Sequence, residues 1–282
     1  MILVTGATGK VGAECVRRLV AQDVAARAFV RSAERAAPLA ESGADIAVGD
    51  LDDPASIDRA LDGVSTVVLV TPGLPAQETA VIDAAVRAGV GHVVYLTSKA
   101  SLDAPVERRR WHAQVELALA DSGLPHTLLR SNAYMQNTLA LAPGIAAAGR
   151  FASSAADGRM GMVDSRDVAA VSAAIAVAPT AHVGKTYHLT GPETISYPEV
   201  AETLTELLGR HIEFEVISRD EEKTRMVSHG VPEPVAAMNA QAFALNATGD
   251  ADWLSEDVHI VTGHRPRSFR DFAVDHLEAF QP

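Results

Sequence analysis

Short apolar runs alternate with helix-like segments over the first half of the chain, and this alternation predicts its fold class. Strands are predicted at Ile2–Val4, Ala26–Val30, Asp45–Val48, Thr66–Val70, His92–Thr97 and His126–Leu129. Helices are predicted between them, at Lys10–Ala21, Ala33–Glu41, Pro54–Leu61, Gln77–Ala88 and Val106–Asp121. Four of these helices run into a glycine, which accepts the left-handed conformation that commonly ends a helix. Repeated strand–helix alternation indicates a parallel sheet covered by helices on both faces.

The second half of the chain is less regular. A helix at Val168–Val177 and a strand at Thr186–Leu189 continue the first pattern. From Pro192 onward the predicted elements are helices at Tyr197–Leu208, Arg219–His229 and Pro234–Ala247, with a strand at Ile212–Ile217. We therefore expect an α/β protein with a Rossmann-type doubly wound parallel sheet and a smaller, mostly helical C-terminal cap. The sheet domain spans residues 1–150, with 163–191 returning to it; the cap spans 192–282, and residues 151–162 could belong to either.

Composition narrows the class of protein. The chain has 282 residues, of which 48% are hydrophobic and 21% charged, as in ordinary soluble proteins. Its net charge of −12 argues against a nucleic-acid partner, because phosphate binding needs a basic face. The single cysteine, Cys15, excludes a disulfide within the chain and suits a reducing cytoplasm. No apolar run reaches the ~18 residues that span a bilayer, so we expect a cytoplasmic protein without a membrane partner.

Three glycines at a spacing of three follow the first predicted strand and open the first predicted helix. This order of strand, glycine turn and helix is typical of a dinucleotide pyrophosphate site. The first glycine permits the tight turn, the second lets the backbone approach the phosphates, and the third lets helix and strand pack closely. An ordinary glycine-rich βα turn is the alternative. The residues expected to bind the cofactor here are Gly6, Thr8, Gly9, Lys10, Val11 and Gly12.

The end of the second predicted strand indicates which dinucleotide binds. An enzyme that uses NAD usually has an acidic residue there, whereas an arginine accommodates the 2′-phosphate of NADP(H). The chain has Arg31 and Ser32 at this place and no acid, so we predict NADP(H), with Arg35 and Lys10 as further candidates. The alternative is that Arg31 is simply a solvated surface arginine.

Residues after the other strands belong to the same edge of the predicted sheet. Asp50 is expected to face the adenine, with Leu51 beside it. The turn at Thr71 and Pro72 is expected to line the cofactor. Ser98 and Lys99 follow the fifth strand, and Lys99 could reach the nicotinamide ribose or a substrate oxygen, or lie in solvent. No histidine spacing indicates a zinc site, so no metal is predicted.

Taken together, the segments Thr5–Gly12, Val30–Arg31 and Leu128–Asn137 resemble the NmrA-like branch of the short-chain dehydrogenase/reductase superfamily. The stretch Gly230–Pro234 is similar to the quinone oxidoreductase and triphenylmethane reductase subgroup. The resemblance covers nearly the whole chain. It implies that Leu128–Asn137 closes the nicotinamide pocket, with the substrate cleft between sheet domain and cap.

The sequence departs from the superfamily at its usual proton donor, a Tyr-x-x-x-Lys pair on the helix after the fifth strand. His112 and Glu116 occupy this spacing and would share one helix face. The pair could donate a proton, or it could be a structural pair on the helix. Tyr134 is the second candidate donor, with an aromatic wall of the pocket as its other interpretation.

These observations support an NADPH-dependent reductase that transfers hydride to a quinone or a similar conjugated small-molecule acceptor. The alternative is a redox sensor of the NmrA type, which would bind NADP(H) without turnover. The missing Tyr/Lys pair favours the sensor, whereas the well-developed cap favours the enzyme. The identity of the acceptor and the oligomeric state stay open at this stage.

Overall fold

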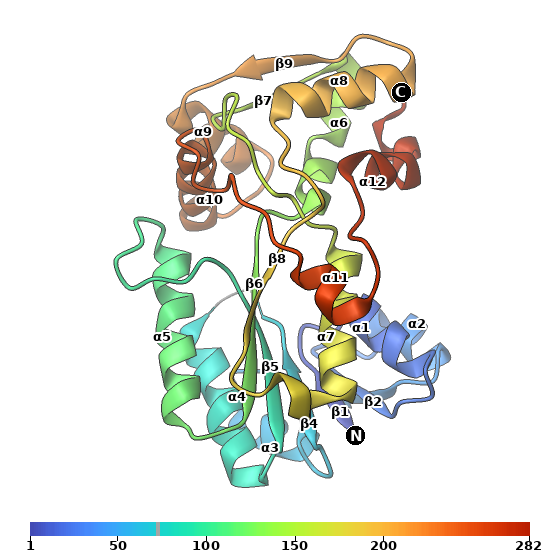
Figure 1. Ribbon diagram of the computed structural model, residues 1–282, viewed down its shortest axis with the longest axis vertical. Helices are drawn as coiled ribbons and strands as arrows, with labels where there is room; N and C mark the ends of the chain where they lie inside the picture. The colour runs from blue at the N-terminus through green and yellow to red at the C-terminus, as the bar shows by residue number, and fades with distance from the viewer. Residues whose placement is uncertain (72–73) are drawn as a thin grey trace. The chain divides into compact units, whose positions relative to one another are not determined.

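The computed structural model describes residues 1–71 and 74–282, which divide into two compact units (Figure 1). The first unit comprises Met1–Ser131, Ser165–His188 and Asp257–Gly263. The second unit comprises Asn132–Asp164, Leu189–Glu256 and His264–Pro282. The first unit ends its longest segment at Ser131, whereas the sequence suggested a domain border at residue 150.

The first unit is built on a seven-stranded sheet with the order β3-β2-β1-β4-β5-β6-β8. The pairings that join β1 to β6 are parallel. The strands are β1 (Ile2–Val4), β2 (Ala26–Val30), β3 (Asp45–Val48), β4 (Thr66–Leu69), β5 (His92–Thr97), β6 (His126–Ser131) and β8 (Thr186–Leu189). The chain adds strands on one side of β1 as far as β3 and then returns to its other side with β4. This topology is the predicted doubly wound Rossmann-type sheet, and that prediction is confirmed.

Helices pack on both faces of this sheet, as Figure 1 shows for α3, α4 and α5 against α1 and α7. One group is α3 (Pro54–Ala60), α4 (Pro75–Ala88) and α5 (Glu107–Asp121). The other group is α1 (Lys10–Val20), α2 (Ala37–Glu41), α7 (Ser165–Val177) and α11 (Asp257–Thr262). The central strands are apolar because they are buried on both faces; in β1 all three residues are buried. Short 3₁₀ turns at Glu34–Ala36 and Pro179–His182 complete the unit.

The second unit has a small parallel sheet of two strands, β7 (Arg150–Ser153) and β9 (Glu213–Val216). Its helices are α6 (Ala142–Ala148), α8 (Tyr197–Leu208), α9 (Arg219–Ser228), α10 (Glu233–Asn246) and α12 (Phe269–Asp275), with 3₁₀ turns at Met135–Ala140 and Leu277–Phe280. Its core is aromatic: Phe151, Tyr197 and Phe214 pack with ring centroids 5.3 to 5.9 Å apart. Such ring pairs join β7, β9 and α8 into one hydrophobic cluster.

One predicted helix was wrong, and four elements were not predicted. The helix predicted at Ala33–Glu41 is a 3₁₀ turn followed by the short α2, because Pro38 lacks the N–H that a continuous helix would use. The strand β7 and the helices α6, α11 and α12 were missed. Within residues 1–71 and 74–282, the structure has no helix whose length and hydropathy would let it cross a membrane.

Candidate functional site

The carboxyl ends of β1 and β4 meet where the strand order reverses, which is the place where doubly wound sheets bind their ligands. Thr5 joins the two ends here. Its hydroxyl donates to the carbonyl of Val70 and accepts from the amide of Val70, both at 2.8 Å. The Thr5 side chain is fully buried, so these bonds hold Val70 against the start of the glycine turn.

The glycine turn that follows β1 tolerates no side chains at two of its three glycine positions. Gly6 has a φ of +55°, and a Cβ there would lie 2.5 Å from the carbonyl oxygen of Val70. A Cβ on Gly12 would lie 2.4 Å from the carbonyl oxygen of Gly6. The close neighbour of Gly12 is therefore the turn itself. Gly9 is less crowded, with its nearest neighbour, the Gly6 oxygen, 3.1 Å from a built Cβ.

The helix α1 begins at this turn and offers its N-terminus to an anion. Its N-cap, Gly9, has no side chain to accept from the first amides, and no residue of the first turn is acidic. Unsatisfied amides at a helix N-terminus carry a partial positive charge that favours phosphate. Thr8 and Lys10 are exposed, whereas the Val11 side chain is buried. Val11 can therefore contribute only its backbone to a ligand. The residues of the turn fit a dinucleotide pyrophosphate.

At the end of β2, Arg31 is exposed and Ser32 is half-buried. The Ser32 hydroxyl accepts a hydrogen bond from the amide of Arg35 at 3.3 Å, which fixes the turn after Arg31. The third arginine of this region, Arg27, is engaged with the Asp45 carboxylate at 2.6 Å. Arg31 and Arg35 are therefore the cations of this strand end that suit a 2′-phosphate.

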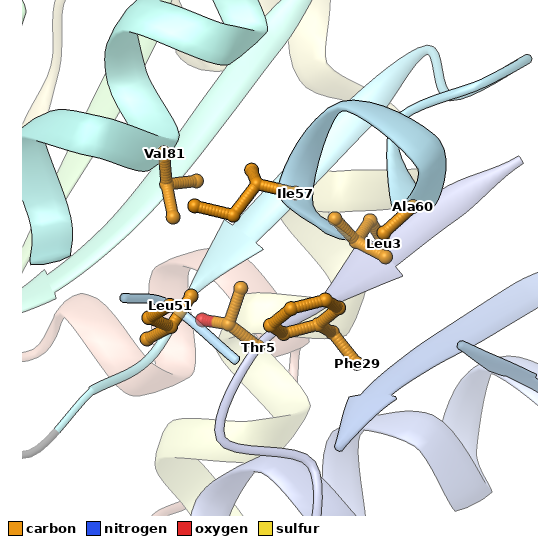
Figure 2. Close-up of a pocket in the computed structure, with 7 residues that line it drawn as sticks. All are labelled: Leu3, Thr5, Phe29, Leu51, Ile57, Ala60 and Val81. Atoms are coloured by element: carbon orange, nitrogen blue, oxygen red, sulfur yellow. The ribbon is translucent and has the colours of Figure 1, made fainter. Parts of the chain in front are cut away.

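After β3, the Asp50 carboxylate accepts from the amide of Asp52 at 3.0 Å. Asp50 thereby stabilises its own turn and remains exposed to solvent. Leu51 is half-buried and lines a narrow apolar crevice. Figure 2 shows its side chain beside that of Thr5, with Ile57 and Val81 above them. The full lining is Leu3, Thr5, Phe29, Leu51, Ile57, Ala60 and Val81.

After β4, Thr71 is half-buried and its hydroxyl donates to the carboxylate of Glu78. Pro72, which was predicted to line the cofactor with it, lies outside the described residues. Glu78 is fully buried in the first turn of α4 and also accepts from the Tyr95 hydroxyl at 3.2 Å. Thr5, Glu78 and Tyr95 were not predicted as site residues. For Glu78 the reason is that an acid in a first helical turn normally indicates a solvated helix start.

After β5, Ser98 is half-buried and Lys99 exposed. The Ser98 hydroxyl lies 2.8 Å from Nδ1 of His112 on α5. Burial, helped by the charge of Arg108, lowers the pKa of His112 to about 4. Its imidazole is thus neutral at pH 7. The Tyr95 ring packs edge-on against it, at a centroid distance of 6.4 Å.

His112 and Glu116 belong to separate networks, although they are four residues apart on α5. Glu116 accepts from the Thr97 hydroxyl at 3.0 Å and pairs with Arg130, whose Nε lies 3.1 Å from Oε1. The imidazole and the carboxylate do not form the acid–base pair considered from their spacing. Glu116 instead ties α5 to β5 and β6.

Tyr134, the second candidate donor, belongs to the second unit. It is half-buried and directly precedes the 3₁₀ turn at Met135–Ala140, and its backbone forms a bridge with Val163. Its neighbour Gln136 donates to the buried Asp164 at 2.8 Å. Among the described residues, no group of three or more His, Cys, Asp or Glu side chains could hold a metal ion.

Comparison with known proteins agrees with this geometry. The model of the NmrA-like family matches residues 1–263. The chain is 40% identical over 286 residues, all of both chains, to (4-alkanoyl-5-oxo-2,5-dihydrofuran-3-yl)methyl phosphate reductase from Streptomyces griseus. It is 36% identical to NAD(P)H azoreductase from Xenophilus azovorans, over 99% of both chains.

Among solved structures, a complex of the NADPH-dependent quinone oxidoreductase from Escherichia coli with NADPH superposes with a TM-score of 0.88. The two chains are 30% identical, and the match covers 99% of this chain and 100% of the other. The match to the family and to full-length relatives extends over the glycine turn, the ends of strands β2 to β5, and α5. The chain therefore belongs to the NmrA-like family.

Proposed function

We propose that this protein is an NADPH-dependent reductase that transfers hydride to a quinone or a similar conjugated, electron-poor small molecule. The observation that carries the proposal is the carboxyl edge of the sheet, where an uncapped helix start lies beside a crowded glycine turn and Arg31 follows β2. A pyrophosphate binds the helix start, and the arginine distinguishes a 2′-phosphate from a free hydroxyl.

The relatives support this class of acceptor. Their names describe an azo compound, a quinone and an acylated dihydrofuranone as the molecules reduced. All three have conjugated, electron-poor π bonds. NADPH supplies a hydride when it is bound, so the task of the chain is to orient the cofactor and to keep its reactive face accessible to the acceptor.

The proton that completes the reduction has two candidate sources in the chain. His112 is neutral at pH 7, so it would pass on a proton through its hydrogen bond with Ser98 and not hold one as an imidazolium. Tyr134 has a hydroxyl of its own to donate. Water is the third source, and then neither side chain would be required.

The test is NADPH oxidation, followed by its absorbance with a panel of benzoquinones, naphthoquinones and azo dyes. We expect turnover with at least one acceptor, and a lower KM for NADPH than for NADH. A fall in kcat of about tenfold or more in Tyr134→Phe or His112→Ala would assign the proton to that residue. Unchanged turnover in both variants would assign it to water.

The redox sensor is the second candidate, because α5 has His112 and Glu116 in place of the tyrosine and lysine. A sensor would bind both NADPH and NADP⁺ tightly and would not oxidise NADPH with any acceptor of the panel. That result, measured by titration calorimetry alongside the kinetics, would contradict the reductase.

A further inference from the structure

Glu78 is a carboxyl group buried in the apolar layer between the sheet and α4. Its exposed fraction is 1%, and its neighbours on the helix, Val81 and Ile82, belong to the hydrophobic core. In the described part of the chain, both of its hydrogen-bond partners are hydroxyl groups, those of Thr71 and Tyr95. Burial raises the pKa of Glu78, while the two hydroxyl donors oppose that change.

A buried carboxyl group costs free energy that an apolar side chain of similar size would not cost. Hydroxyl donors compensate this less than a cation would. Stability alone therefore gives no reason for an acid at position 78. The reason lies in what its two oxygens hold, because each oxygen reaches a different strand.

One oxygen accepts from Thr71, which follows the end of β4, and the other accepts from Tyr95 on β5. Tyr95 pairs in register with Leu69, the last residue of β4. Val70, between Leu69 and Thr71, is held by Thr5, which directly follows β1. Successive residues at the end of β4 are thus fixed from both neighbouring strands and from α4, directly beside the glycine turn.

We propose that Glu78 is a positioning residue for NADP(H), acting through Thr71 at the edge where the strand order reverses. This role rests on the proposed function. Glu78 binds the Thr71 hydroxyl and so fixes the backbone at Val70 and Thr71, beside the glycine turn. Tyr95 fixes the carboxyl group from the other side, and loss of either hydroxyl loosens the same contact.

A double-mutant cycle on the full-length protein tests the role through equilibrium binding. We expect Glu78→Leu and Thr71→Val each to raise the Kd for NADPH about tenfold, as loss of a buried hydrogen bond does. The double variant should bind no more weakly than the weaker single variant, because both substitutions break one contact. Glu78→Gln retains an acceptor oxygen and should bind within about threefold of wild type.

The matched control is Ile82→Val, a buried position on the same helix that faces the core. It should lower Tm without changing the Kd for NADPH. The kcat at saturating NADPH should be unchanged in Glu78→Leu, so that the effect appears in KM alone. If Glu78→Leu does not fold, Thr71→Val and Tyr95→Phe provide the same measurement.

Two results overturn the role alone: wild-type affinity for NADPH in folded Glu78→Leu or Thr71→Val, or fully additive losses in the double variant. Failure of the proposed function looks different. A wild-type protein that binds no NADPH overturns that function and this role together, whereas wild-type binding without turnover overturns only the reductase.

Discussion

At the scale of single residues, Gly9 and Gly12 separate the demands of folding from those of binding. A Cβ at position 12 would meet a backbone oxygen at 2.4 Å, whereas one at position 9 would meet it at 3.1 Å. We predict that Gly12→Ala lowers the free energy of unfolding by about 1–3 kcal/mol, the usual cost of overpacking, and abolishes NADPH binding. Gly9→Ala should keep most of the stability yet still weaken binding, because its Cβ obstructs the phosphates. Urea unfolding and NADPH titration measure both quantities, and equal losses of stability would contradict the distinction.

Arg31 carries the choice between the two dinucleotides. We predict that Arg31→Ala raises the Kd for NADPH about tenfold and leaves that for NADH unchanged, because only NADPH presents a 2′-phosphate to the guanidinium. Arg59→Ala removes another exposed arginine, one near Asp53 on α3, and is the matched control. Parallel losses for both cofactors in Arg31→Ala would place the 2′-phosphate elsewhere.

At the scale of elements, α8 shows how much a helix start contributes. Ser196 accepts from the Glu199 amide, and the Glu199 carboxylate accepts from the Ser196 amide at 2.8 Å, which forms a complete capping box. We predict that Ser196→Ala lowers the free energy of unfolding by about 1 kcal/mol. Thr203→Ala on the same helix lacks a capping role and should cost less. Chemical denaturation followed by tryptophan fluorescence would detect the difference. Equal losses of unfolding free energy in the two variants would contradict the prediction.

The same elements show what the sequence could predict. Strands such as Ile2–Val4 were predicted to the residue, because a buried strand of a parallel sheet needs a continuous apolar run. The strand β7 was missed, because its four residues are defined by pairing with β9, more than fifty residues away. The helix α12 could have been found from its capping box, in which Ser268 precedes Asp271 by three residues.

For the site, backbone positions were predictable and side-chain partners were not. The glycine turn and the residue after each strand follow from local pattern, because parallel strands end at a common edge. The partners of His112 and Thr71 depend on how α4 and α5 pack on the sheet. Spacing along α5 suggested Glu116 for His112, yet Arg130 from β6 attracts that carboxylate more strongly than a neutral imidazole does.

At the scale of the whole molecule, two buried histidines should make stability depend on pH. Burial lowers the pKa of His92 to about 4, helped by the nearby His126 and His182, and the pKa of His112 is lowered equally. The unfolded chain takes up protons below pH ~6.5 while the folded chain does not, so stability present above that pH is lost as the pH falls toward 4. Between pH 7 and 5 each histidine should cost on the order of 2 kcal/mol.

The measurement is urea unfolding at pH 7, 6 and 5, for wild type and for His92→Gln and His112→Gln. In each variant, the free energy of unfolding should decrease less between pH 7 and pH 5 than it does in wild type. Glu78 acts with the opposite sign, because burial raises its pKa and the folded chain binds its proton more readily. The comparison between variants removes that contribution, and identical slopes in all three proteins would contradict the prediction.

The bonds between Thr5 and Val70 join residues 65 positions apart, and this has a consequence during synthesis. Residues 1–12 leave the ribosome before β4 does, and the wall behind Gly6 does not exist until β4 and Val70 have been made. A nascent chain that ends before residue 70 therefore presents the glycine segment without its final shape. Cofactor capture must await β4, and once it occurs it stabilises the part of the sheet already assembled while the rest is still being translated.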